Sequence, residues 1–190
     1  MTKFIFHGGG VDQTTGNNEL FYRELVKDIP NGGTLLLCYF ASREDDYSQN
    51  AKKITNLCKQ LFSNKDLNVE LATRDIFFKQ IAKADAIYFR GGSTEKLLSS
   101  LKEYDGLKEA LAGKVIGGSS AGAYALSTYF SSHYEDIAQE GLGIAPVRVV
   151  THYGSDTMPP RVNAVEVLKR TAEDLELIIL KEGEWRVVKQ

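Results

Sequence analysis

Short apolar runs alternate with segments of helical periodicity along most of this chain. The runs are rich in β-branched and aromatic residues, which is typical of buried strands. They are KFIF, TLLLCYF, NVELA, AIYF, VIG, VRVV and LELIIL. Between most of them, apolar residues recur at helical spacing, as in NELFYRELVKDI, AKKITNLCKQLF and TEKLLSSLKEY. Strands that alternate with helices predict an α/β fold in which a mostly parallel sheet is covered by helices on both faces.

Two parts of the chain depart from this alternation. The tail LELIILKEGEWRVV reads as two strands joined by a Glu-Gly turn, which predicts an antiparallel hairpin at the sheet edge. Pro159 and Pro160 precede a segment with helical character, which predicts a helix over residues 161–174. The sequence has no internal repeat and no low-complexity linker, so we expect one domain over residues 1–190.

The charge and composition limit the classes of partner. The chain has 23 Lys and Arg against 25 Asp and Glu, a net charge of −2, with no long basic block. This balance argues against nucleic acid and against an anionic membrane surface. Its apolar runs are too short to cross a bilayer, and its start lacks the features of a signal peptide, so we expect a cytoplasmic protein. The two cysteines, Cys38 and Cys58, suit a reducing compartment.

The most informative motif is Gly118-Ser119-Ser120-Ala121-Gly122, which matches G-x-S-x-G with Ser120 at its centre. It follows the apolar run VIG and precedes a helical segment, as a nucleophile elbow does when it holds a serine on a strained strand-to-helix turn. A tight or phosphate-binding turn between a strand and a helix has the same glycine-rich appearance. The motif by itself leaves both interpretations open.

A serine nucleophile needs a base, and the chain has three histidines. His152 directly follows VRVV, so it is expected at the carboxyl end of a strand, close to the elbow. His7 also follows a strand but adjoins three glycines, and His133 lies in a polar segment. Several acids could orient the imidazole, and the residues favour none of them: Glu135, Asp136, Glu140 and Asp156.

A second glycine-rich turn, Arg90-Gly91-Gly92-Ser93, also lies between a strand and a helix. Its backbone N–H groups could stabilise a developing oxyanion together with the N–H of Ala121. An anion-binding nest is the alternative interpretation. The chain lacks both G-x-G-x-x-G and G-x-x-x-x-G-K-[ST], which argues against nucleotide binding.

Four segments in this order give the sequence a recognisable pattern: AIYFRGGSTEKLL, VIGGSSAGAYAL, GLGIAPVRVVTHYG and LKEGEWRVV. Together they resemble the aspartyl dipeptidase (dipeptidase E) family of serine peptidases, to which cyanophycinase is more distantly related. The resemblance implies a three-layer α/β/α sandwich of the class I glutamine amidotransferase type. It also implies Ser120 as nucleophile and His152 as general base, with an acid about fifteen residues after the serine, for which Asp136 is the first choice and Glu135 the second.

The same resemblance assigns the oxyanion donors and part of the substrate site. Gly92 and Ala121 match the positions expected to supply the oxyanion N–H groups. Gly91 and Arg161 are expected at the substrate, Arg161 because it lies near where family members carry basic residues. No metal or organic cofactor is implied.

We therefore expect a serine hydrolase that cleaves short peptides through an acyl-enzyme, and a homodimer is a further expectation. The alternative from another class is a non-catalytic sensor or binding module on the same fold. Cysteine chemistry of the glutamine amidotransferase kind is disfavoured, because the elbow carries Ser120 and neither cysteine is near it in the sequence.

Overall fold

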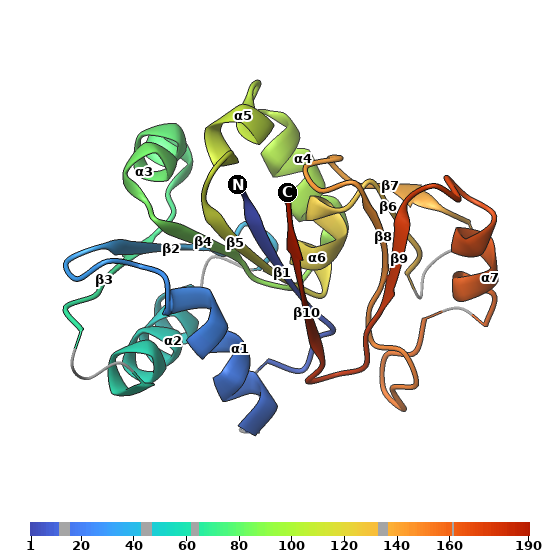
Figure 1. The fold of residues 1–190 in the computed structure, drawn as a ribbon, viewed down its shortest axis with the longest axis horizontal. Coiled ribbons are helices and arrows are strands. Elements are labelled where there is room, and N and C mark those ends of the chain that lie inside the picture. Colours follow the sequence, from blue (N-terminus) through green and yellow to red (C-terminus); the bar gives the residue numbers. More distant parts are fainter. Residues whose placement is uncertain (12–15, 43–46, 62–64, 133–136, 161) are drawn as a thin grey trace.

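The computed structural model describes residues 1–11, 16–42, 47–61, 65–132, 137–160 and 162–190. A six-stranded sheet with the order β10-β1-β5-β4-β2-β3 forms its centre (Figure 1). All neighbouring strands in this sheet are parallel except β10 and β1. The strands are β1 (Lys3–His7), β2 (Thr34–Cys38), β3 (Asn68–Leu71), β4 (Ala86–Phe89), β5 (Val115–Ser119) and β10 (Trp185–Lys189).

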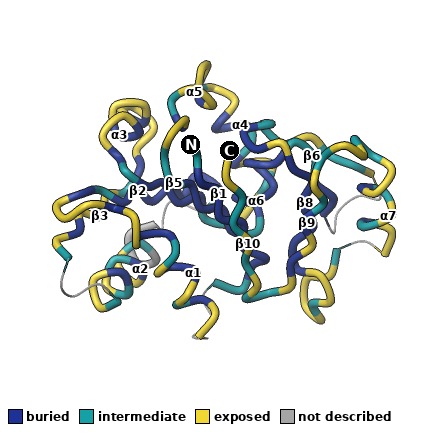
Figure 2. Tube along the Cα trace, in the orientation of Figure 1, coloured by how far each residue is buried: buried dark blue, intermediate teal, exposed yellow. Residues whose placement is uncertain are grey.

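Helices cover both faces of this sheet, as the sequence predicts. Alternate side chains of β1 separate the faces: Ile5 packs in one apolar cluster, and Phe4 and Phe6 pack in the other. The cluster with Ile5 includes residues of α1 (Gly16–Val26) and α2 (Tyr47–Leu61). The opposite cluster includes residues of α3 (Phe77–Lys83), α4 (Thr94–Lys102), α5 (Leu107–Leu111) and α6 (Ala121–Leu126), and a 3₁₀ turn, η2 (Arg74–Ile76), precedes α3. Because both faces are covered, the central strands are buried (Figure 2).

A second sheet, which the sequence reasoning did not separate from the first, lies beside α6 (Figure 1). Its order is β7-β6-β8-β9, from strands β6 (Tyr129–Phe130), β7 (Gln139–Glu140), β8 (Val147–Val150) and β9 (Glu176–Ile179). Apolar side chains of β6, β8 and β9 belong to the same cluster as α6 and one face of the large sheet. The two sheets therefore share one continuous core.

The helix predicted over residues 161–174 is shorter in the structure, where α7 spans Ala164–Lys169. The buried guanidinium of Arg148 donates hydrogen bonds to the carbonyls of Leu168 and Thr171, at 2.6 and 2.9 Å, and to that of Leu175. The carbonyl of Leu168 is one of those that the end of a helix leaves without a partner, and the other two belong to the segment that follows α7. Arg148 thus stabilises a turn where a longer helix was expected.

The predicted hairpin at the end of the chain is wrong. β9 pairs in parallel with β8 of the small sheet, whereas β10 pairs antiparallel with β1 of the large sheet. Residues 180–184 therefore cross from one sheet to the other, and we call them the crossover. A short link between two strands is typical of a hairpin, but each of these strands has its hydrogen bonds to a different sheet.

Parallel pairing brings the carboxyl ends of the central strands to one edge of the sheet. His7 at the end of β1 is in register with Ser119 of β5, and Phe89 of β4 is in register with Gly118. The turns after these strands consequently meet, as ligand-binding turns of parallel sheets do. Among the helices described, none combines the length and the apolar character that crossing a bilayer requires.

Candidate active site

Ser120 occupies the turn between β5 and α6, as the motif predicts. Its φ of 50° and ψ of −113° lie outside the regions that L-residues ordinarily adopt. The glycines around it permit close packing: a Cβ at Gly122 would lie 2.0 Å from the carbonyl oxygen of Phe89. The side chain of Ser120 is thus held on a strained turn, against the end of a neighbouring strand.

His152 bridges Ser120 and a carboxylate. Its Nε2 lies 2.8 Å from Oγ of Ser120, and its Nδ1 lies 2.8 Å from Oε1 of Glu182. A carboxylate can only accept, so Nδ1 carries the proton, and Nε2 is free to accept the hydrogen bond of the serine hydroxyl. The His152 side chain is 9% exposed and that of Glu182 is 24% exposed. The arrangement is that of a serine, an oriented base and an orienting acid.

The crossover carries Glu182 over the end of β1. The N–H of Gly8 donates to the carbonyl of Glu184, and the N–H of Gly183 donates to the carbonyl of Gly9, at 2.9 and 3.0 Å. Ser155 adds a hydroxyl that donates to Oε1 of Glu182 at 2.9 Å. The position of Glu182 is therefore fixed both by the backbone hydrogen bonds of the crossover and by the hydrogen bond from Ser155 to its carboxylate.

Sequence reasoning missed Glu182 as the partner of the histidine. Glu135 and Asp136, the acids that the family resemblance favoured, lie outside the described residues, as does Arg161. Asp156 and Glu140 are exposed, and neither contacts His152 among the interactions of the described residues. The signal for Glu182 was its place in the LKEGEWRVV segment, directly after an apolar strand.

The turn after β1 forms a floor beneath the histidine ring. The N–H of His152 donates to the carbonyl of Gly8 at 2.9 Å. A Cβ at Gly9, whose φ is +106°, would lie 2.1 Å from Cε1 of His152. Only a residue without a side chain leaves the imidazole its place.

His7 and Asn18 stabilise this floor. Nδ1 of His7 accepts the N–H of Gly9 at 3.1 Å, so its Nε2 carries the proton and donates to Oδ1 of Asn18 at 2.9 Å. The amide of Asn18 in turn donates to the carbonyl of Gly10. Burial lowers the pKa of His7 from 6.5 to about 4, although the hydrogen bond that His7 donates to Asn18 raises it, and the nearby His152 lowers it further. His7 is therefore neutral at physiological pH and serves as a fixed support.

The two predicted oxyanion donors flank Ser120. Ala121 is the first residue of α6, and Gly92 lies in the turn between β4 and α4. Neither backbone N–H donates to another described residue. A Cβ at Gly91 would lie 3.1 Å from Cβ of Ser120, which places this turn directly against the serine. The N–H of Gly91 already donates to Oγ of Ser119 at 3.1 Å. Gly91 can therefore contact a substrate through its other backbone atoms but not through this N–H.

Comparison with known families matches residues 4–190 to peptidase family S51. The chain belongs to this family. The resemblance inferred from the sequence motifs is thereby confirmed over nearly the whole chain. Comparison with curated proteins finds no match.

Two solved structures share the fold of this S51 member. One is a peptidase from an acI-B1 Actinobacterium, with a TM-score of 0.68 and 24% identity, covering 100% of this chain and 84% of the other. The second is described as a candidate peptidase E protein from Listeria monocytogenes EGD-e, with a TM-score of 0.61 and 17% identity, covering 100% and 98%. These similarities confirm the α/β fold class, and the low identities limit them to the fold.

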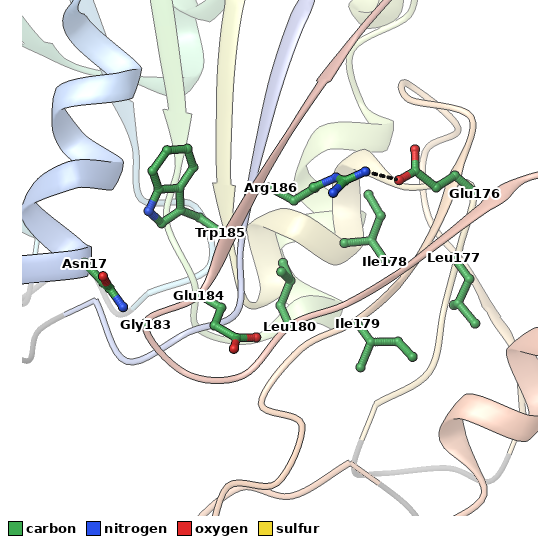
Figure 3. Close-up of a pocket in the computed structure, with 10 residues that line it drawn as sticks. All are labelled: Asn17, Glu176, Leu177, Ile178, Ile179, Leu180, Gly183, Glu184, Trp185 and Arg186. Atoms are coloured by element: carbon green, nitrogen blue, oxygen red, sulfur yellow. Dashed lines mark hydrogen bonds and ion pairs between the residues drawn. The ribbon is translucent and has the colours of Figure 1, made fainter.

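Among the described residues of this S51 member, grooves lie beside the turns that carry the site and beside the crossover. One of about 350 Å³ is lined by Glu182, Lys181 and residues 153–157, beside the His152–Glu182 pair. Another of about 620 Å³ begins at Ser93, next to Gly92, and includes Glu95, Lys102 and Gln139. A third groove, of about 610 Å³, lies between β9 and β10, where Arg186 bridges to Glu176 at 3.2 Å (Figure 3). Neither Ser120 nor His152 lines any of these grooves.

The burial of the two cysteines of this S51 member argues against a role for either as a nucleophile. Cys38 and Cys58 are free and buried. Burial raises the pKa of each thiol to about 12, so both are protonated at physiological pH. The reactive form of cysteine is the thiolate, and these positions therefore argue against cysteine chemistry. Within the described ranges, no cluster of three His, Cys, Asp or Glu side chains could hold a metal.

Proposed function

We propose that this S51 family member hydrolyses short peptides with Ser120 as nucleophile, His152 as general base and Glu182 as the acid that orients the histidine. The observation that carries the proposal is the imidazole of His152, which lies 2.8 Å from both Ser120 Oγ and Glu182 Oε1. The positive φ of both Ser120 and His152 adds support, since backbone strain in non-glycine residues gathers at functional sites.

The proposed reaction has two halves. Oγ of Ser120 attacks the scissile carbonyl while its proton passes to Nε2 of His152, and the N–H groups of Gly92 and Ala121 stabilise the oxyanion. The C–N bond then breaks as Nε2 returns the proton to the leaving amine, which leaves an acyl-enzyme. Water, deprotonated by the same nitrogen, attacks the ester, and the bond to Oγ breaks as the serine regains its proton.

The size of the neighbouring grooves supports a short peptide as substrate. The grooves beside Glu182 and beside Gly92 have volumes of about 350 and 620 Å³, in the range of small-molecule sites. Charged side chains occur in both linings, which suits the free termini of a peptide, and the groove beside Gly92 also has the apolar side chains Leu98 and Phe130. Preference for aspartate, a contribution of Arg161, a cytoplasmic location and a homodimer stay predictions.

The test compares wild type with Ser120→Ala in the hydrolysis of dipeptides that begin with Asp, Glu or a neutral residue. A fluorophosphonate probe, followed by mass spectrometry of the adduct, measures the reactivity of the serine independently of the substrate. We expect a single adduct on Ser120 and no turnover by the variant. Ser127→Ala is a matched control, because Ser127 is a buried serine at the other end of α6 whose hydroxyl donates to the Tyr124 carbonyl.

Undiminished hydrolysis by Ser120→Ala would overturn the assignment. A wild-type protein that neither reacts with the probe nor cleaves any peptide of the panel would favour the non-catalytic binding module instead.

A further inference from the structure

The elbow contains two serines, and the catalytic proposal uses only the second. Ser119 is the last residue of β5 and is 1% exposed. Its Oγ accepts the backbone N–H of Gly91 at 3.1 Å and lies 2.8 Å from the hydroxyl of Tyr88. A side chain on the elbow itself thus holds the neighbouring glycine turn.

This glycine turn needs a support because its residues lack side chains. Gly92 has a φ of +150°, and a Cβ there would lie 2.5 Å from the carbonyl oxygen of Ala41. Two consecutive glycines have wide conformational freedom, whereas an oxyanion donor must be fixed before the reaction begins. The structure must therefore restrict the turn by other means.

Hydrogen bonds fix the backbone on both sides of Gly92. The N–H of Arg90 donates to the carbonyl of Cys38, and the N–H of Ser93 donates to the carbonyl of Ala41, at 3.0 and 2.9 Å. The N–H of Gly91 is held by Ser119. In this run of four amides, Gly92 is the one whose N–H has no partner among the described residues.

Ser119 is itself held by a rigid aromatic neighbour. Tyr88 in β4 is fully buried, and its ring packs edge-on against Phe21 and Tyr22, with centroids 5.7 and 5.9 Å apart. Its hydroxyl reaches Ser119 from the adjacent strand, so the serine oxygen is restrained by a group outside the elbow. The chain of contacts runs from the core to the glycine turn.

We propose that Ser119 is a positioning residue for the oxyanion hole: it holds the N–H of Gly91 so that the N–H of Gly92 faces the reacting oxygen. The inference rests on the proposed function, since it assumes that Ser120 is the nucleophile. It assigns the two serines of the elbow to different tasks, attack for Ser120 and alignment of the oxyanion donor for Ser119.

The test measures the rate of fluorophosphonate labelling at Ser120 as a function of pH, because the phosphoryl oxygen of the probe occupies the oxyanion position. In Ser119→Ala we expect the maximal rate to fall by about 10-fold or more, somewhat less than the loss of an oxyanion donor. The pH midpoint should not move, since His152 is untouched. Ser127→Ala, matched in burial and in the loss of one hydroxyl, should label at close to the wild-type rate.

Ser119→Cys is the second variant if Ser119→Ala does not fold, because it keeps the size of the side chain and replaces the oxygen by a weak acceptor. Circular dichroism and the melting temperature identify which variants are folded. A folded Ser119 variant that labels at the wild-type rate overturns the inference, and so does one whose pH midpoint shifts, because its effect then runs through His152. Failure of wild type to label at Ser120 overturns the proposed function and this inference together, whereas the preceding outcomes overturn this inference alone.

Discussion

The two sheets contribute to the candidate site in different ways. The large sheet supplies Ser120 and Gly92 in turns that directly follow adjacent parallel strands, β5 and β4. The small sheet supplies His152 after β8, and the crossover from β9 to β10 brings Glu182 to it. We call Ser120 and Gly92 the serine half of the site, and His152 and Glu182 the histidine half. The geometry of the serine half depends on neighbouring strands of one sheet, whereas that of the histidine half depends on how the two sheets are joined.

This difference explains why the two halves have different supports. Ser120 and the glycine turn are fixed by strand register and by Ser119. His152 is fixed from three directions: the ring contacts Gly9, the backbone N–H donates to Gly8, and Nδ1 is bonded to Glu182. The histidine half is thus the one in which a single displacement between the sheets would separate the reacting groups.

Among the substitutions in the histidine half, we expect Glu182→Gln to cause the largest loss of reactivity. An amide at this position can donate a hydrogen bond to Nδ1 and so favour the wrong imidazole tautomer. We expect the labelling rate of Ser120 to fall by about 10⁴-fold, as for loss of the acid in other catalytic triads. Labelling kinetics with the fluorophosphonate probe measure the effect.

The matched control for Glu182→Gln is the double variant Glu135→Gln/Asp136→Asn. It neutralises the acids favoured by the family resemblance, and we expect it to label within a few fold of wild type. If the double variant loses reactivity and Glu182→Gln does not, the acid has been assigned to the wrong segment.

A smaller effect is expected from Gly9→Ala, which tests the floor under His152. The added Cβ would lie 2.1 Å from Cε1 of the imidazole, so the ring must move away from Ser120 or Glu182. Misplacement by an ångström costs about 10²-fold in rate, and we expect a loss of this order in labelling.

Gly113→Ala separates this clash from backbone strain alone. Gly113 also has a positive φ, of +78°, but a Cβ there meets no atom within 4 Å. It should lower stability by about 1–2 kcal/mol without changing the labelling rate. Equal losses of reactivity in the two variants would show that strain, and not the contact with His152, is responsible.

The smallest expected effect is on the free energy of unfolding and comes from His7, which is buried between the serine half and the histidine half. Its folded pKa of about 4 lies below the ordinary 6.5, because burial disfavours the charged ring. Between these values the unfolded chain binds a proton that the folded protein does not, so stability falls as pH decreases from 6.5 toward 4. From pH 7.5 to pH 5, this group should cost about 2 kcal/mol of unfolding free energy.

Urea unfolding of wild type and His7→Gln at both pH values isolates this contribution, because the other titrating groups are common to the two proteins. We expect the free energy of unfolding to fall less with acidification in the variant. Parallel pH dependences in the two proteins would contradict the burial of a neutral His7.

The large sheet and the strand-to-helix turn at Ser120 could be predicted from the sequence, and the reasons are physical. Apolar runs and helical periodicity reflect burial within each element, so the parallel sheet and its covering helices could be inferred. The elbow around Ser120 is likewise a local feature, since its glycines and its strand-to-helix turn are contiguous. His152 was predicted near Ser120 because both follow strands.

The features that the sequence did not predict depend on contacts between distant parts of the chain. The hairpin expected in LELIILKEGEWRVV does not form, because β9 and β10 find partners in different sheets. Glu182 could not be identified for the same reason: its position over β1 depends on the crossover. The contacts of Ser119 with Gly91 and Tyr88 could not be inferred either, because they join two segments that lie 28 and 31 residues apart in the sequence.

Proton NMR of the imidazole N–H tests most directly whether the Nδ1 proton of His152 is bonded to Glu182. We expect a downfield N–H signal, assigned by its loss in His152→Gln, that is also lost in Glu182→Ala and kept in Glu135→Gln/Asp136→Asn. A signal that persists in Glu182→Ala and disappears in the double variant would show that Glu135 or Asp136, and not Glu182, orients His152.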